Sequence, residues 1–552
     1  MEWAPASAIR WLFSSQHGAS DRLLPRWLFL RALGLIYFSA FFSLAFQIRG
    51  LMGPDGILPA RQYLQAVARA LGHTSRLWYA PTLLWFSSSS TMLMALCWAG
   101  MVASVLLVLN LWPRGMLVIC LACFLSFVSA AQDFSGYQSD GMLLEAGFIA
   151  LFFAPSGFRP GLAPSNPASR ASLFLLLWEW FRIYFESGVV KIASGDPQWR
   201  HFTAMDEYYQ NGPLPTWIGW YVQQLPHWFH AGTVYATLAM ELGLVWMMFL
   251  PRRWRIVLFF IVTPWQIGVI LTANYTFLNY LVLSLGVLLL DDGFIAFLLK
   301  LCHSEPFVSA LARRGRAEES AVTDSTAAAP LAPRASQPIP RRLRTAYYVV
   351  KLSVASVMLS WIFYATTVPL LWMFTTAIPL PIAPVTALEP FRIANRYGLF
   401  AVMTRGRYEI EFQGSQDGQN WTAYPFRYKP QDVKTPPGIY APYQPRFDWN
   451  LWFASLGSWR DYPIVANAEV RLLSNDKDVL TLFAGNPFPQ QPPQQIRAVL
   501  WQYWFSSLAE KSLTGNWWRR QFLGLYAPVL EREPDGTIVV IEMPEEAAPD
   551  AR

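Results

Sequence analysis

Charged residues are scarce in this chain. They make up 14% of its 552 residues, whereas ordinary soluble proteins contain about 25%. Hydrophobic residues account for 54%, and 26 residues are tryptophan. This composition argues against an ordinary soluble enzyme and indicates a membrane protein. The mean hydropathy is only +0.26, however, so a substantial part of the chain must lie in water.

Cysteine is also rare, with 4 residues in the whole chain. Cys97, Cys120 and Cys123 lie in apolar runs, Cys302 follows one, and the long polar C-terminal part has none. No disulfide framework is predicted. Cys120 and Cys123 have the spacing of a redox pair, but a dry helix disfavours the thiolate and blocks access to it. Plain packing is therefore the preferred interpretation.

Several motifs that would point to soluble chemistry are missing. The chain has no P-loop, no dinucleotide-binding fingerprint and no HExxH. His227 and His230 are three residues apart but lack a third ligand nearby, so no metal site is predicted. The net charge of +7 comes with arginines clustered between apolar runs, where membrane topology explains them better than nucleic acid does. We therefore expect no nucleic-acid partner.

Long apolar runs are what the sequence has instead. A helix that crosses a bilayer needs about 20 predominantly apolar residues. Stretches of this kind lie at 27–48, 90–110, 115–132, 141–155, 171–190, 232–250, 254–272, 276–292 and 345–366. The first is too long for the apolar core of a signal peptide, so we expect it to be retained as a span. The sequence thus predicts a membrane α-helical bundle of about nine transmembrane helices.

Lys and Arg gather in every second connection between these runs, as expected for the cytoplasmic side of a membrane. The loop 49–89 is an exception, and its part 78–88 could be re-entrant or interfacial. The alternation predicts the following layout: a cytoplasmic N-terminus at 1–26, the bundle at 27–300, a disordered cytoplasmic linker at 301–344, a last transmembrane helix at 345–373 and an extracytoplasmic domain at 374–552.

The C-terminal domain is expected to be mostly β. Residues 407–428, "RYEIEFQGSQDGQNWTAYPFRY", contain two strand-like runs around Asp417-Gly418, a hairpin signal. Further strands are expected at 468–474, "AEVRLLS", and at 537–543, "TIVVIEM". The aromatic-rich stretches 436–456 and 496–508 are expected to contribute helices.

Three charged residues fall on one face of the fifth predicted span. Glu179, Arg182 and Glu186 are spaced i, i+3, i+7, so they can pair along a helix. One interpretation is a structural ion-pair network that faces the bundle interior. The other is a site lining a water-filled cavity, because charges inside membranes are often functional.

Lys191 lies roughly 140° around the helix from Glu186 and so leaves that face. Gly188 is expected to interrupt the helix before it. Lys191 is then either a snorkelling anchor at the membrane interface or a partly desolvated amine that acts as a base or nucleophile. The remaining polar residues of the intramembrane network are expected to pack against partner helices: Glu145, Glu241, Asn274 and Asn279.

Long motifs spread along the chain resemble the lipase maturation factor family. They include "GPDGILPA" (53–60), "YQSDGMLLEAGFIALFFAP" (137–155), "LTANYTFLNYL" (271–281), "APYQPRFDWNLWFASL" (441–456) and "GNPFPQQPP" (485–493). The resemblance runs almost end to end and is interrupted at the linker. It implies a multi-pass membrane protein that helps dimeric lipases to fold and assemble. In animals such proteins reside in the endoplasmic reticulum, with the C-terminal domain in the lumen.

A second, shorter resemblance concerns "YFESGVVKIASGDPQW" (184–199), which is similar to a segment of the vitamin K-dependent γ-carboxylase family. This resemblance carries the catalytic role over to Lys191 alone. The neighbouring residues of the motif are Gly188, Asp196, Pro197, Trp199 and Arg200.

Two main functions follow from these resemblances. The first and preferred one is a non-enzymatic maturation factor without a cofactor, whose partners are the bilayer and secreted clients such as lipases. The alternative is a carboxylase-like membrane enzyme that uses a quinone-like or other lipid-soluble cofactor, or a lipid substrate, through Lys191. A transporter is disfavoured, because the sequence shows no internal repeat. Residue usage leans towards a bacterial source, which would place the chain in the cell inner membrane. A eukaryotic source would place it in the endoplasmic reticulum membrane.

Overall fold

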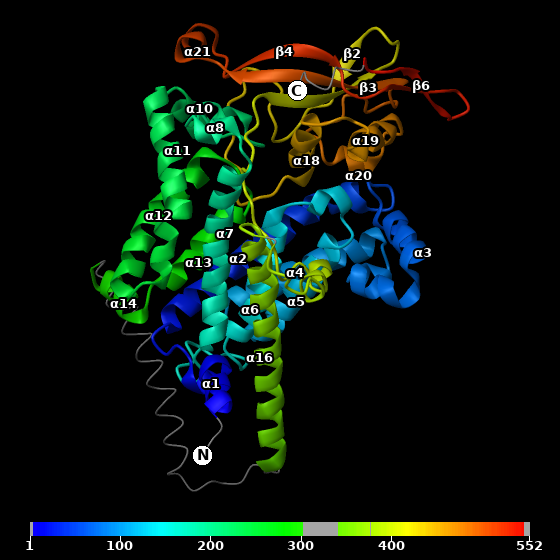
Figure 1. Cartoon of the computed structure of the whole chain (residues 1–552). Helices are drawn as coiled ribbons and strands as arrows, with labels where there is room; N and C mark the ends of the chain where they lie inside the picture. The colour runs from blue at the N-terminus through cyan, green and yellow to red at the C-terminus, as the bar shows by residue number, and fades with distance from the viewer. Residues whose placement is uncertain (1–3, 302–340, 376, 546–552) are drawn as a thin grey trace.

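The computed structural model describes residues 4–301, 341–375 and 377–545. A helical bundle forms one end of the molecule and a β-sheet domain forms the other (Figure 1). The long helices of the bundle are α1 (Ala4–Phe13), α2 (Leu23–Met52), α3 (Ala60–Tyr79), α4 (Ser90–Val108), α5 (Pro113–Val128), α6 (Gln138–Phe153), α7 (Arg170–Ala193), α11 (His227–Leu242), α12 (Arg252–Thr272), α13 (Leu278–Gly286), α14 (Asp292–Leu301) and α16 (Arg341–Trp372). Three short helices lie between α7 and α11: α8 (Pro197–Arg200), α9 (Tyr208–Asn211) and α10 (Trp217–Gln223).

Each of the nine predicted spans contains helix, but the predicted number of crossings is not confirmed. By length and hydropathy, five helices within the described residues could cross a membrane: α2, α4, α11 together with the following 3-10 turn (Leu244–Phe249), α12 and α16. A sixth candidate is the pair Leu278–Leu289 and Asp292–Lys300, which is bent by 101°. Helices α5 and α6 have only 16 residues each, and α7 carries the three charges described above.

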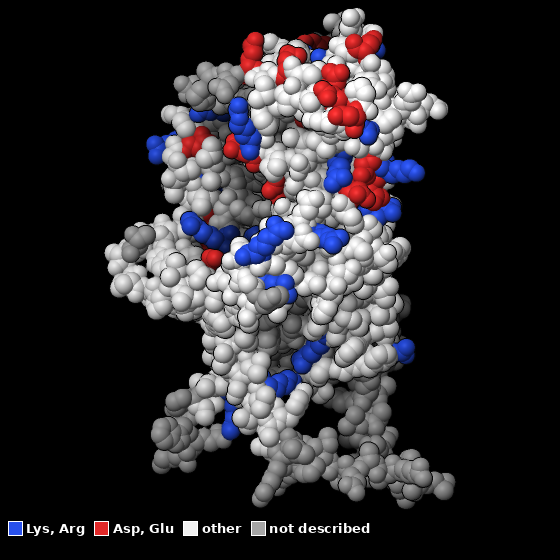
Figure 2. Space-filling model, turned by 90° about the vertical axis from the view of Figure 1, so that its right-hand side faces the viewer, with Lys and Arg blue, Asp and Glu red and all other residues white. Residues whose placement is uncertain are grey.

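The outer surface of the bundle fits a membrane environment. Large apolar side chains are exposed on several of its helices: Trp98 and Val102 on α4, Val257 and Ile261 on α12, Val354 and Val357 on α16. On the face shown in Figure 2, acidic side chains lie only on the upper part, and the lower part carries scattered Lys and Arg on an otherwise uncharged surface. The bundle is therefore a membrane-embedded helical fold.

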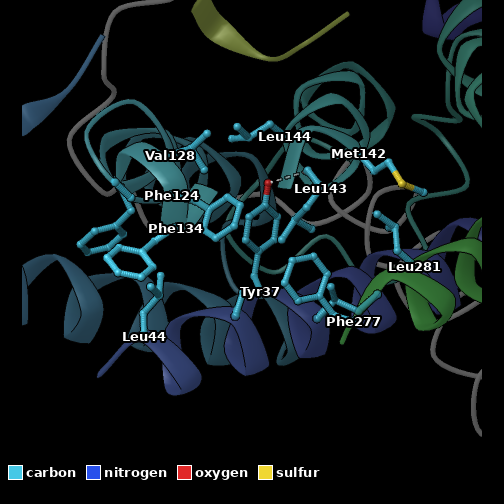
Figure 3. Close-up of a cluster of buried hydrophobic side chains, with 14 of the residues drawn as sticks. Tyr37, Leu44, Phe124, Val128, Phe134, Met142, Leu143, Leu144, Phe277 and Leu281 are labelled. Atoms are coloured by element: carbon cyan, nitrogen blue, oxygen red, sulfur yellow. Dashed lines mark hydrogen bonds between the residues drawn. The ribbon is translucent and has the colours of Figure 1, made fainter. Parts of the chain in front are cut away.

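A continuous apolar core fills the bundle around α2. Tyr37 on this helix stacks at right angles against Phe124 of α5, and its hydroxyl donates a hydrogen bond of 3.0 Å to Leu143 O on α6 (Figure 3). Gly147 leaves room for that hydroxyl, since a Cβ at this position would lie 2.1 Å from it. The core thus depends on close helix approach as well as on apolar area.

Two predicted connections between helices, 49–89 and 301–344, differ from the structure. The connection 49–89, read as a loop, contains helix α3, in which Gly72 has φ 72° and kinks the helix. The predicted linker 301–344 lies mostly outside the described residues. At its two ends, however, residue 301 belongs to α14 and residues 341–344 belong to α16. The helical bundle therefore extends past its predicted end at 300, and the last long helix begins before its predicted start at 345.

The C-terminal part forms a sheet of six antiparallel strands: β1 (Arg407–Ser415), β2 (Trp421–Ala423), β3 (Gln495–Phe505), β4 (Trp518–Leu525), β5 (Val529–Arg532) and β6 (Ile538–Glu542). The order is β2-β1-β3-β5-β6, and β4 also pairs with β3. Its helices are α17 (Ala383–Thr386), α18 (Arg446–Ser455), α19 (Pro463–Leu473), α20 (Lys477–Leu480) and α21 (Leu508–Thr514). Helices α18, α19 and α20 lie between the sheet and the bundle (Figure 1).

The strand predictions are partly right. Asp417-Gly418 lies in the turn of the β1–β2 hairpin, and 537–543 contains β6. The stretch 468–474 is helical instead, because its buried residues follow a helical spacing that includes Val465, Ala468 and Leu472. The helix expected at 496–508 is wrong, since most of this stretch forms β3, the strand that pairs with β1, β4 and β5. The domain is therefore a sheet backed by helices.

Buried polar contacts hold this domain on the bundle. Arg446 at the start of α18 donates to both carboxylate oxygens of Asp140 on α6, each at 2.8 Å, and to Phe134 O at 2.6 Å. Asn274, between α12 and α13, accepts hydrogen bonds from the backbone N–H groups of Tyr440 at 2.7 Å and Ala441 at 3.0 Å. The two parts therefore share an interface of specific, directional contacts.

Candidate functional site

The charged row on α7 finds its partners on other segments. Glu179, Arg182 and Glu186 are all fully buried. Arg182 pairs with Glu145 of α6, while its distance to Glu186 Oε1 is 3.9 Å. The same guanidinium donates to Asn395 O at 2.6 Å. Arg182 thus lies at the centre of a network that spans α6, α7 and the chain after the last long helix.

That later chain, residues 395–404, supplies most of the remaining hydrogen bonds. The Asn395 backbone N–H donates to Glu145 at 2.9 Å, and the Tyr397 hydroxyl donates to the same carboxylate at 2.9 Å. The Tyr397 backbone N–H donates to Glu186 Oε2 at 2.6 Å. Buried carboxylates need such donors, because an unpaired charge away from water is costly. The network therefore fixes residues 395–404 against α7.

Lys191 has a separate partner. Its Nζ donates to both carboxylate oxygens of Glu241 on α11, at 2.8 and 2.9 Å, and to Leu399 O at 3.1 Å. Only 2% of its surface is exposed, so it is not a snorkelling anchor. The ion pair links α7, α11 and the segment 395–404 at one point.

Gly188 does not interrupt the helix as predicted, since α7 continues to Ala193. Instead, it allows α7 and α11 to approach closely. A Cβ at position 188 would lie 2.9 Å from the Cβ of Glu241 and 2.9 Å from Cδ2 of Leu242. Glycine at this position therefore makes room for the helix that carries the partner of Lys191.

The remaining residues of the motif around Lys191 lie in and next to helix α8. Asp196 caps α8 through the N–H of Gln198 at 3.0 Å and accepts the Met403 N–H at 2.7 Å. Trp199 is buried, donates to Phe400 O at 3.0 Å, and holds its ring 5.2 Å from Lys191 Nζ. Pro197 is the first residue of α8 and Arg200 is its exposed last residue. The motif binds residues 400–403 and shields the lysine.

Lys191 also borders a cavity of about 490 Å³. Helices α7, α11, α12 and α13 form one part of its wall, and α18 with residues 398–404 forms another. Ligand pockets in proteins commonly measure about 300–1,000 Å³. The cavity therefore has the size of a small-molecule site and lies where the bundle meets the sheet domain.

A second polar group faces this cavity. Tyr184 on α7 donates to Gln266 Oε1 on α12 at 2.7 Å, and Gln266 donates to Asn279 Oδ1 on α13 at 2.7 Å. All three residues line the cavity. Asn279, predicted as a packing residue, thus ends a hydrogen-bonded chain that crosses three helices.

The remaining sequence candidates lie apart from the cavity. The Asn274 side chain makes its hydrogen bonds to backbone groups of the sheet domain and of residues 214–215. His227 contacts Asp206 at 3.0 Å, and His230 is buried on α11. Across residues 4–301, 341–375 and 377–545, no group of three or more His, Cys, Asp or Glu side chains has the arrangement of a metal site.

Several residues of the site were not identified from the sequence: Asp140, Tyr184, Gln266, Asn395, Tyr397 and Arg446. Gln266 and Tyr184 lie inside long apolar runs, where a polar group needs a partner, and this is a signal that could have found them. Asn395 and Tyr397 lie in a segment without periodicity, and no local pattern marks them.

Comparisons with known proteins agree over almost the whole chain. Residues 24–297 match the lipase maturation factor transmembrane domain, and residues 393–528 match the lipase maturation factor C-terminal domain. Lipase maturation factor 2 from Gallus gallus is 32% identical over 92% of this chain and 81% of its own length, and the Homo sapiens protein is 32% identical over 92% and 82%. Lipase maturation factor 1 from Bos taurus is 30% identical over 92% of this chain and 89% of its own length.

No solved structure gives a significant match. The named relatives are animal proteins, so they lend no support to the bacterial source that residue usage suggested. Both matched domains, the helical one and the C-terminal one, coincide with the two parts of the fold described above. On these grounds the chain belongs to the lipase maturation factor family.

Proposed function

We propose that this chain is a membrane maturation factor that helps secreted clients, such as dimeric lipases, to fold and assemble. The observation that carries the proposal is the match of both family domains, together with relatives that align over 92% of the chain. The bundle serves as the anchor and the sheet domain contacts the client. Strand β4 is exposed along most of its length, with Phe522 and Leu523 both open to solvent.

The test uses this surface, because deleting the whole domain would also remove the partners of Glu145 and Asp140. A secreted lipase is co-expressed with the full chain, and its specific activity and its cross-linked complex with the chain are measured. Phe522→Asp together with Leu523→Asp is expected to lower both. Val540→Asp on β6, an equally exposed strand position, is the matched control. Unchanged lipase maturation by the β4 variant would contradict a client role for this surface.

We further infer about nine membrane crossings, a cytoplasmic N-terminus and a C-terminal domain in the lumen of the endoplasmic reticulum. Glycosylation of the chain itself can test on which side of the membrane the C-terminal domain lies. Asn420 in "NWT" is exposed, whereas Asn274 in "NYT" is buried and fully bonded. In a cell that glycosylates, Asn420 should carry a glycan, and Asn420→Gln should abolish it. Lack of a glycan on the folded chain, with a lumenal control protein modified, would contradict this orientation.

The alternative is an enzyme that acts on a lipid substrate, or with a quinone-like cofactor, through Lys191. The observation in its favour is that Lys191 borders a cavity. Lys191 Nζ donates to both carboxylate oxygens of Glu241, so this contact would have to open before the amine could act on a ligand. Under this alternative, Lys191→Ala abolishes activity while the protein still inserts and folds. Under the maturation role, Lys191→Ala impairs clients only as far as it destabilises the chain.

A further inference from the structure

The cavity beside Lys191 has apolar, aromatic walls. The side chains that form them come from the bundle and from the sheet domain: Trp199, Trp265, Val269, Val282, Trp452 and Phe453. Helix α12, which contributes Trp265 and Val269, is a candidate span with only 17% of its apolar window buried. The wall of the cavity is therefore a helix whose other side faces the bilayer, and the bilayer is a source of amphiphilic ligands.

The charges at the cavity cancel. Among the described residues that line it, Lys191 and Glu241 are the only Lys, Arg, His, Asp or Glu side chains, and they bind each other. A charged ligand would therefore have to leave water without meeting an opposite unpaired charge, at high cost. This arrangement favours a ligand of no net charge.

Three residues that line the cavity each carry a buried polar atom without a hydrogen-bond partner. The indole Nε1 of Trp449 on α18 has no acceptor, Oδ1 of Asn211 on α9 has no donor, and the Tyr275 hydroxyl has neither. Trp449 and Asn211 belong to contacting elements, because Trp452 of α18 donates to Asn211 O at 3.1 Å. Buried polar atoms are rarely left unpaired, and each costs about 1–3 kcal/mol. The unmet indole donor and the unmet amide acceptor therefore call for a ligand group that can both accept and donate.

We propose that this cavity binds a single-chain amphiphile of no net charge. Its apolar chain lies between α7, α11, α12 and α13, and a hydroxyl-bearing head accepts from Trp449 Nε1 and donates to Asn211 Oδ1. The volume of about 490 Å³ accommodates one such molecule. The site requires binding alone, so it stands whether or not the chain assists lipases or uses Lys191 in catalysis.

The test uses the full chain in nanodiscs of saturated phosphatidylcholine, with 1-monooleoylglycerol as the neutral probe and oleate as its anionic counterpart. Native mass spectrometry measures the fraction of protein with a bound probe. One molecule of monooleoylglycerol per chain is expected, and at least about tenfold weaker binding of oleate. Equal binding of the two probes, or no monooleoylglycerol bound to folded protein, would overturn the proposal.

Matched variants locate the probe. Val269→Trp fills the cavity, whereas Val257→Trp adds the same bulk to the exposed face of the same helix. We expect the first to lose monooleoylglycerol and the second to bind it as the parent does. Trp449→Phe keeps an aromatic side chain and removes the unmet donor, so it should still fold while binding the probe up to about tenfold more weakly. Parent-like binding by both Val269→Trp and Trp449→Phe would refute this site.

Discussion

The ion pair between Arg446 and Asp140 can test how the sheet domain is held on the bundle. Two guanidinium nitrogens of Arg446 bind the two oxygens of Asp140, and the side chains are only 3% and 1% exposed. Solvent screening is therefore minimal. Breaking such a pair leaves a buried charge without its partner, which costs about 3–5 kcal/mol.

Three variants measure this contribution: Asp140→Leu, Arg446→Met and the two together. Each single change should destabilise the docking of α18 by about 3–5 kcal/mol. The double change replaces the pair with apolar side chains, and such replacements are often close to neutral. It should therefore be more stable than either single variant, with a coupling energy of at least about 2 kcal/mol.

Hydrogen exchange of the α18 amides is the appropriate measurement, because it reports the free energy of local opening in a protein that does not unfold in two states. A loss of about 3–5 kcal/mol corresponds to protection that is roughly two to four orders of magnitude weaker. Amides of α12 serve as the internal control. If the double variant loses the sum of the two single losses, the side chains are not coupled and the ion pair does not hold the domain.

Two further changes test other contacts. Gly188→Ala should cost about 1–3 kcal/mol in thermal unfolding, because its Cβ would crowd Glu241. Gly268→Ala on α12 meets nothing within 4 Å and should be neutral or stabilising, so equal effects would refute the close-approach argument. Burial raises the pKa of Glu469 on α19 well above its usual 4.5, so its contribution to stability is full below pH 4.5 and declines as pH rises towards the folded pKa, by up to about 1.4 kcal/mol per pH unit. Glu469→Gln should therefore gain stability relative to the parent on going from pH 5 to pH 8, and a difference independent of pH would contradict it.

The helices of the bundle were predictable because apolar runs are local signals. A run such as 90–110 becomes helix wherever the membrane leaves backbone groups without water. The same reasoning failed for α3, because its polar, arginine-containing sequence resembles a loop unless the helical period is sought. Reasoning from apolar runs also did not give the number of membrane crossings. Helices α5 and α6 are helical but short, and packing rather than length decides where they lie.

In the sheet domain, turn residues predicted secondary structure correctly, whereas short apolar runs did not. Asp417-Gly418 specifies a tight turn by itself, because Gly418 adopts φ 71°. The stretch 468–474 can alternate as a strand or face the core as a helix, and seven residues do not decide between the two. Its helical state depends on packing against β3, which the local sequence does not contain.

The polar site was predictable only in part, for the same reason. Helical spacing identified which residues of α7 share a face, yet Arg182 pairs with Glu145, 37 residues earlier, and Lys191 pairs with Glu241, 50 residues later. Asn395 reaches Glu145 across 250 residues. Spacing along one helix assigns a face, whereas the choice of partner depends on which helices pack together.

The intramembrane charges divide between a structural network and a cavity wall in this fold. Glu179, Arg182 and Glu186 are not among the residues that line the cavity, whereas Lys191 and Glu241 are. The Lys191–Glu241 pair is a structural contact between α7 and α11, and it also forms part of the wall of a cavity. Residues 395–404 connect the network with the cavity, since Tyr397 binds Glu186 of α7 and Glu145 of α6 while residues 398–404 line the cavity. Any movement of the sheet domain that shifts this segment must therefore disturb the buried charges and the cavity together. A molecule bound in the cavity would in turn favour the docked position of the sheet domain, because binding to one conformation shifts the population towards it.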